Sequence, residues 1–197
     1  MSIARVKASS LTQGLPKQKT MLAGNSTILP GSYESIATTT LGSAQATISF
    51  TSISNVYKHL QIRYISRSSN TGQANIIVTF NSDTASTYKA HYLEGNGSAA
   101  SAGVFSSGDA RAIGYSTGTT QSANVFAVGV IDILDYANTN KNKTTRSLVG
   151  YDNNGSGIVD FDSLMYASTS AITRIDLALS GGWNFAQYSS FALYGIR

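Results

Sequence analysis

The stretch VFAVGVIDILDY at residues 125–136 decides the fold, because no other part of the chain is so apolar over so many residues. Polar segments bound it on both sides, TGTTQSAN before it and ANTNKNKTT after it. A short apolar run of this kind, rich in β-branched residues, is typical of a strand that is buried on both faces. We therefore predict a central strand in the middle of a β-sandwich. We expect Asp132 to point outward or to be hydrogen-bonded, since an unpaired buried carboxylate is costly.

The composition favours one domain built almost entirely of strands. The chain has 197 residues, which is long enough to bury a core, and 42% of them are hydrophobic. Only 12% are charged, against about 25% in an average soluble protein. Serine, threonine, asparagine and glycine supply the remaining polarity, and all four disfavour helix interiors. We expect almost no helix.

Outside the central stretch, alternating apolar and polar residues are separated by turn-forming clusters, which is the signal for strands and hairpins. These runs lie at residues 33–40, 46–50, 60–66, 75–80, 88–93, 145–151, 157–166, 172–179 and 190–196. Residues 94–124 are rich in glycine and serine, which suggests long surface loops with one or two short edge strands. About ten short strands without helices predict an all-β, antiparallel, jelly-roll-like β-sandwich at residues 33–197.

An extended N-terminal arm is predicted at residues 1–32, which hold both prolines and apolar residues without a sustained period. Four of the 14 basic residues and none of the 10 acidic residues lie there, so the rest of the chain is formally neutral. We expect the arm to become ordered against another protein, with its cations meeting an acidic surface. The alternative is a flexible tail with incidental lysines. The candidate anchoring residues are Arg5, Lys7, Leu11, Leu15, Lys17, Lys19, Met21 and Leu22.

Several classes of site and partner are disfavoured. The absence of cysteine excludes disulfides, thiol nucleophiles and cysteine-ligated zinc. The first residues lack the apolar core of a signal peptide, and no run approaches the roughly 18 apolar residues of a membrane span. We therefore expect a chain made in the cytosol, without membrane insertion. Nucleic acid is a poor partner for a neutral domain, and the arm alone would bind it only weakly.

No motif singles out a catalytic site. His59 and His91 lie beside aromatic strand residues, and no recognisable nucleophile motif accompanies them. A glycosidase needs two placed carboxylates, but no spacing selects a pair among Asp132, Asp135, Asp160, Asp162 and Asp176. We expect neither an enzyme nor a cofactor.

The loop DNNGSG at residues 152–157 is the one candidate calcium site, because oxygen-bearing side chains alternate before a glycine. Its twelfth position is Ser163, where a calcium loop has a bidentate glutamate. We interpret the loop as a glycine-rich hairpin turn, because Asn-Gly sits between two apolar strands.

The loop GGWNF at residues 181–185 holds the only tryptophan. With Tyr188 nearby, Trp183 and Asn184 are candidate contacts to a sugar or protein receptor, since aromatic faces stack while amides bond hydroxyls. The alternative, which we favour, is that Trp183 caps one end of the core, because large aromatic residues are usually mostly buried.

A series of segments in the predicted domain has a distinctive order: YKHLQIRYISRS, FNSDT, YKAHYLEGNGS, VIDILDYANTNKNKTTRSLVGYDNNGSG, AITRI and NFAQYSSFALYGIR. Together they resemble a recurrent module in structural proteins of tailed bacteriophages, over roughly residues 33–197. The most specific parts are DILDYANTNKNKT and FALYGIR. Members are described as tail-fibre-like, minor tail or unassigned virion proteins. The resemblance therefore implies a place in the virion and no catalytic motif.

We accordingly predict a non-enzymatic structural protein of the bacteriophage virion, made in the bacterial cytoplasm. It is expected to belong to the tail fibre or baseplate, to dock on other virion proteins through its arm, and to contact a glycan or protein of the host surface. A homo-oligomer is expected, and the resemblance implies a trimer. Two alternatives stay open: a capsid decoration (cement) protein that clamps the shell, and a carbohydrate-binding module.

Overall fold

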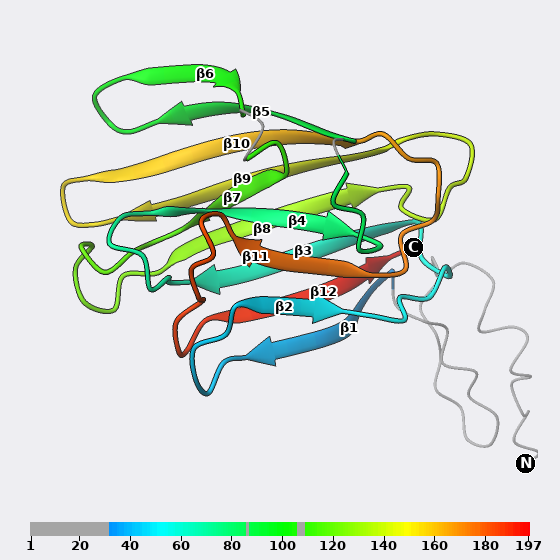
Figure 1. Cartoon of the computed structure of the whole chain (residues 1–197), viewed down its shortest axis with the longest axis horizontal. Helices are drawn as coiled ribbons and strands as arrows, with labels where there is room; N and C mark the ends of the chain where they lie inside the picture. Colours follow the sequence, from blue (N-terminus) through cyan, green and yellow to red (C-terminus); the bar gives the residue numbers. More distant parts are fainter. Residues whose placement is uncertain (1–31, 86, 106–108) are drawn as a thin grey trace, which may run out of the picture. The chain divides into compact units, whose positions relative to one another are not determined.

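The computed structural model describes residues 32–85, 87–105 and 109–197 (Figure 1). Apart from Ser32, the predicted arm at residues 1–32 lies outside these ranges, and so do all its candidate anchoring residues. The described residues contain strands and no helix, as the composition predicts. In this part of the chain, no helix has the length and apolarity that crossing a membrane requires.

Twelve strands in the described ranges form two antiparallel sheets that pack face to face (Figure 1). The large sheet has the order β1 (Tyr33–Thr40), β12 (Ser190–Ile196), β3 (His59–Ser66), β8 (Ala127–Leu134), β9 (Lys143–Asp152), β10 (Gly157–Tyr166), β5 (Tyr88–Gly95) and β6 (Ala100–Val104). The small sheet has the order β2 (Thr47–Phe50), β11 (Ile175–Leu179), β4 (Ala74–Phe80) and β7 (Ala112–Ser116). The prediction of an all-β sandwich is confirmed.

The pairing of eight of these strands is nested. β1 pairs with β12, β2 with β11, β3 with β8, and β4 with β7. A chain paired in this way runs as one long hairpin that wraps around the core, which is the arrangement of two Greek keys. This nested order is consistent with the predicted jelly-roll-like topology, which stays a prediction. The hairpins β5–β6 and β9–β10 are additions that widen the large sheet beyond β8.

The core lies where the inner face of the large sheet meets the small sheet. Apolar residues from both sheets are almost completely buried there, among them Leu60, Ile62, Ile131, Ile133, Ile76, Val78, Ile175 and Leu177. An aromatic group continues the core, with ring centroids 4.8 Å apart for Tyr88 and Tyr166 and 5.5 Å apart for Phe80 and Tyr166. Full burial of such side chains contributes about 1.5–3 kcal/mol each, so they dominate the energetics of the fold.

The stretch at residues 125–136 forms β8, the fourth strand of the large sheet. Its position as a central strand is confirmed, but its expected burial on both faces is wrong for the described structure. The small sheet covers the face that carries Ile131, whereas Val128 and Val130 on the other face are exposed. Asp132 lies on this outer face and accepts hydrogen bonds from Gln61 (2.8 Å) and Arg146 (3.2 Å), as expected for a paired carboxylate.

The prediction of one or two short edge strands at residues 94–124 is confirmed, because β6 ends the large sheet and β7 ends the small one. All five residues of β7 are nevertheless buried. The reason is tertiary: β7 also contacts β8, β9 and β10 of the large sheet. An edge strand can therefore be an interior element when a neighbouring sheet is wide enough to cover it.

The connection from β8 to β9, which contains the sequence DYANTNKNK, is organised by a buried ammonium group. The side chain of Lys143 is 0% exposed. Its Nζ donates to the carbonyl oxygens of Asn138 (2.6 Å), Lys141 (3.0 Å) and Thr169 (3.1 Å). On the surface of the same connection, Asp135 pairs with Lys141 and Lys58, and hydrogen bonds from Lys141 lower the pKa of that carboxyl group. These contacts fix the path between the two strands.

Replacing Lys143 by methionine should lower the free energy of unfolding by about 1–3 kcal/mol, because several buried carbonyl groups lose their donor. Urea denaturation measures the effect. The matched control is Lys89→Met on the exposed side of β5, which should change stability by no more than about 0.5 kcal/mol. Equal effects of the two substitutions would contradict a structural role for the Lys143 ammonium group.

Candidate functional site

The outer face of the large sheet, which points away from the small sheet, is strongly apolar. Antiparallel sheets usually place polar side chains on the face that meets water. Here the large exposed hydrophobic side chains on β3, β5, β6, β8, β9 and β10 are Ile65, Leu93, Val104, Val128, Val130, Leu134, Leu148, Val159, Phe161 and Met165. We call this set the outer apolar face. Exposed patches of this kind mark surfaces that bind other molecules.

The strand register aligns these residues into a row that crosses the sheet. Val130 on β8 stands opposite Leu148 on β9, which stands opposite Phe161 on β10, which stands opposite Leu93 on β5. Side chains directly opposite each other on antiparallel strands have their Cβ atoms about 4.5–5.5 Å apart, so the row is continuous. Arg63 on β3 closes the row at one end, opposite Val130.

A shallow groove of about 470 Å³ lies along this row, between Val128, Val130, Leu148 and Val159. Its floor includes Gly150, where a Cβ atom would lie 2.8 Å from the carbonyl oxygen of Ile158. A larger residue at position 150 would collide with the backbone of β10. The glycine therefore keeps the two strands close and leaves the apolar groove open.

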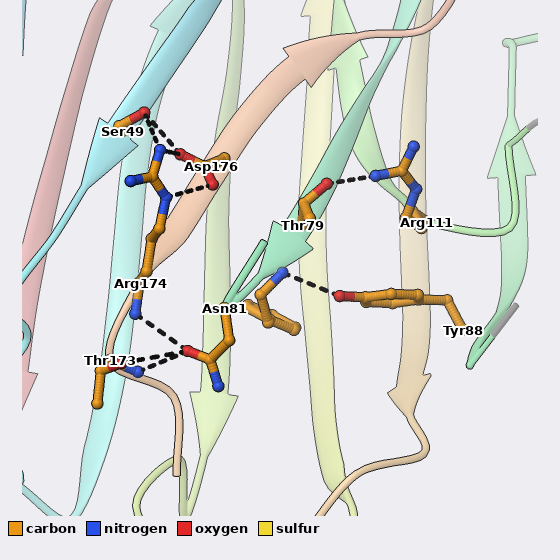
Figure 2. Close-up of polar contacts among 9 residues, drawn as sticks. Ser49, Thr79, Asn81, Tyr88, Arg111, Thr173, Arg174 and Asp176 are labelled. Atoms are coloured by element: carbon orange, nitrogen blue, oxygen red, sulfur yellow. Dashed lines mark hydrogen bonds and ion pairs between the residues drawn. The ribbon is translucent and has the colours of Figure 1, made fainter. Parts of the chain in front are cut away.

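The outer face of the small sheet has the opposite character. In Figure 2, Arg174 and Ser49 both bond the carboxylate of Asp176, with donor to acceptor distances of 2.7 Å from Arg174 Nε and 2.6 Å from Ser49 Oγ. On the loops at the end of this sheet, the Asn81 side chain accepts a hydrogen bond from the Thr173 N–H at 2.9 Å. Charged and hydroxyl groups are thus paired there, as expected for a surface that faces water. The two outer faces of one sandwich differ, and only that of the large sheet is apolar.

On part of strand β10, the apolar side chains face outward and the acidic side chains face inward. Val159 and Phe161 are exposed, with 62% and 46% of their surface accessible, whereas Asp160 and Asp162 are 0% and 1% exposed. The sequence IVDFDSLMY separates these two sets by alternation, but it does not say which set faces the core. Leu164 and Tyr166, on the same side as the two aspartates, pack in the core and decide the orientation.

The five aspartates considered as glycosidase carboxylates lie in four places. Asp132 is on the outer face, Asp135 is at the β8–β9 connection, and Asp176 is on the small sheet. Asp160 and Asp162 are brought together, two residues apart on one side of β10. Their burial leaves no route for a saccharide. No pattern in the sequence selects this pair, because its enclosure depends on the packing of β7 across β10.

His59 takes a structural position, whereas His91 lies on the surface. His59 Nδ1 accepts a hydrogen bond from the backbone N–H of Asp135 at 2.9 Å, which ties β3 to the end of β8. His91 is exposed on β5 and stands opposite Ser163 on β10 and Val104 on β6. The hydrogen bonds found in the described ranges do not connect either imidazole to a serine or threonine hydroxyl.

The loop at residues 152–157 forms the tight turn of the β9–β10 hairpin. The Asn153 N–H donates to the carbonyl oxygen of Ser156 at 2.7 Å, and Asn154 and Gly155 have positive φ angles of 55° and 107°. Positive φ at both central residues is typical of the Asn-Gly hairpin turn, so this interpretation is confirmed. Within the described ranges, no group of three or more histidine, aspartate or glutamate side chains could hold a metal ion.

Trp183 does not cap the core, and our favoured interpretation of it is wrong. Its side chain is 43% exposed, while Phe185 two residues later is 0% exposed and packs edge-on against Phe191 with centroids 4.8 Å apart. The core position at this end of the sandwich is therefore taken by Phe185. The indole of Trp183 instead lies against Gly181.

The other two candidate receptor contacts are also exposed. Asn184 exchanges hydrogen bonds with Ser69, whose N–H donates to the Asn184 carbonyl oxygen at 2.9 Å and whose Oγ accepts from the Asn184 N–H at 3.1 Å. Tyr188 is 68% exposed and has a positive φ of 70°. The aromatic contacts of the described residues do not join Tyr188 to Trp183. The loop thus presents separate aromatic groups rather than one stacking platform.

The chain matches no family model, no curated protein sequence and no solved structure. The resemblance to structural proteins of tailed bacteriophages therefore stays a prediction. The functional proposal therefore rests on the geometry of the domain.

Two substitutions on opposite sides of β10 test the orientation of this strand. Leu164→Ala, on the core side, should lower the free energy of unfolding by about 2–5 kcal/mol. Phe161→Ala, on the outer apolar face, should lower it by less than about 1 kcal/mol in the isolated chain, because it leaves no cavity. Urea unfolding of both variants makes the comparison. A loss from Phe161→Ala as large as that from Leu164→Ala would show that Phe161 belongs to the core.

Proposed function

We propose that this chain is a non-enzymatic structural protein of a tailed-bacteriophage particle, and that copies of it assemble through the outer apolar face. The observation that carries the proposal is the row from Val130 to Leu93, which is apolar across four strands and is covered by no described residue. Burying such surface is favourable at roughly 25 cal/mol per Å². The resemblance of the sequence to phage structural proteins supports the virion as the setting.

A second copy of the chain is the partner that suits this face best. Two polar side chains beside the apolar row are paired within the domain: Arg146 with Asp132 at 3.2 Å, and Arg63 with the neutral amide of Gln61 at 2.9 Å. The ion pairs found in the described ranges do not include Arg63 or the exposed Lys89 of β5, so the few unmatched charges lie beside the row and not in it. An apolar centre with a polar rim is the usual anatomy of a protein interface. Two flat sheet faces can pack about 10 Å apart, as in a sandwich.

Within the particle, we propose a place in the tail fibre or baseplate, with the arm at residues 1–32 docked on another virion protein. The exposed Trp183 and Tyr188 are then available for a glycan or protein of the host surface. The same exposure supports the second candidate function, a carbohydrate-binding module, since partly exposed aromatic rings are suited to stack on sugars. Both functions leave the outer apolar face for contacts between copies.

Placing a charge in the apolar row tests assembly. In the phage that encodes the chain, Leu148→Asp should remove the protein from purified particles, because the carboxylate would have to be buried against apolar neighbours. Thr47→Asp, an exposed position on the small sheet, is the control and should leave incorporation unchanged. Immunoblots of purified particles give the measurement. Normal incorporation of the Leu148→Asp variant would contradict the proposal.

The amount of wild-type protein in the same particles distinguishes the locations. A handful to a few dozen copies, relative to the major shell protein, fits the tail or baseplate. A count in the hundreds would mean a decoration protein that clamps the shell. Absence from particles, together with glycan binding by the purified chain, would favour the carbohydrate-binding module.

A further inference from the structure

Asp160 and Asp162 form an acidic pair inside the sandwich that the proposed function does not use. Both side chains are essentially inaccessible, at 0% and 1% exposure. The Ser147 hydroxyl donates to Asp162 Oδ2 at 3.2 Å. Both oxygens of Asp160 and Oδ1 of Asp162 have no hydrogen-bond partner among the described residues. Buried polar atoms without partners are rare, and each requires an explanation.

The described groups that surround the pair supply no positive charge. On β5, Glu94 stands opposite Asp160 and Tyr92 stands opposite Asp162. On β7, the Tyr115 hydroxyl donates to Glu94 Oε2 at 3.0 Å. The ion pairs found in the described ranges do not include Asp160, Asp162 or Glu94.

Tyr64 on β3 also faces the pair, and its hydroxyl donates to the carbonyl oxygen of Tyr115 at 3.0 Å. Burial raises the pKa of the Tyr64 and Tyr115 hydroxyls, so both phenols are neutral near pH 7. On β9, Ser147 contributes a hydroxyl without charge. The pair is therefore enclosed by acids and neutral groups on every element that packs against it.

Two ionised carboxylates buried two residues apart on one side of β10 would repel each other. A carboxylate can only accept hydrogen bonds, so the two groups can bond each other only when one of them is protonated. Burial, and then the neighbouring Asp160, raise the pKa of Asp162 to about 8. Burial likewise raises the pKa of Asp160. The two groups titrate as one unit rather than as independent acids.

We propose that Asp160 and Asp162 share a proton, and that this proton-binding site holds β10 and its neighbours against β7. Loss of the proton leaves negative charge enclosed beside Glu94 and loosens this packing. β9, β10 and β5 also carry Leu148, Phe161 and Leu93, so the proton site lies directly behind the centre of the outer apolar face. Proton sharing by this pair does not depend on whether the chain belongs to a virion.

The direction of the pH dependence follows from the raised pKa. Below the ordinary aspartate value of 3.8, the folded and unfolded chains are both protonated at this site. Between 3.8 and about 8, the folded chain keeps a proton that the unfolded chain has lost. Unfolding therefore becomes about tenfold more favourable per pH unit for each retained proton, and the change levels off above that range.

The test compares urea unfolding of the full chain from pH 5 to pH 9. The wild-type unfolding constant should rise about tenfold per pH unit up to about pH 8. The double variant Asp160→Asn/Asp162→Asn keeps the shape of both groups and should abolish this rise. The control Asp176→Asn removes an exposed-side carboxylate that Arg174 binds, and it should keep the wild-type slope. An unchanged slope in the double variant would overturn the inference.

A second measurement serves if the double variant does not fold. The carboxyl carbons of the wild-type chain can be titrated by NMR, and two of them should respond together well above pH 5. Titration of every aspartate below pH 5 would overturn the proposal. A further test adds calcium chloride at pH 6, where the proposal keeps a proton on the pair. If calcium stabilises the wild-type chain and not the double variant, the pair is a cation site instead, and the proton-sharing account is wrong.

Discussion

The packing of the small sheet against one face of the large sheet is the constraint on which the rest of the structure depends. Ile62 and Ile131 on the large sheet and Leu177 on the small one are buried in the same core. Side chains alternate strictly along a strand, so fixing one residue in the core fixes the direction of every other residue on that strand. The register of β8, β9 and β10 then assigns each of their side chains to the core or to the outer face.

This constraint produces both unusual features of the domain. On β10, the core positions of Leu164 and Tyr166 force Asp160 and Asp162 inward and Val159 and Phe161 outward. Among the described residues, the interior then carries an acid pair that no cation neutralises, and the exterior carries an apolar row that no other residues cover. Acidic residues usually face water and apolar residues usually face the core. Positions that break these preferences are often functional sites. A proton shared by Asp160 and Asp162 would lower the cost of the buried acid pair. Assembly through the outer apolar face would remove the exposed apolar row from water.

Much of the fold could be predicted from the sequence, because alternation and turn residues report on local structure. The stretches at residues 33–40, 157–166 and 190–196 coincide with β1, β10 and β12, and the Asn154-Gly155 turn was identified from its residue types. The outer face could not be predicted, because an apolar run indicates burial without saying what covers each side. The exposure of Trp183 does not follow from the sequence for a related reason: Phe185 competes for the same core position, and only the packing decides between the two residues.

Cysteine labelling tests the central claim, that the outer apolar face is covered in the assembled protein. The chain has no cysteine of its own, so single substitutions report on one position each. Leu148→Cys and Thr47→Cys should both react quickly with a soluble maleimide in the isolated, unassembled chain. In purified particles, the account predicts that the cysteine at position 148 is protected while that at position 47 stays reactive. Equal reactivity of both positions in particles would contradict it.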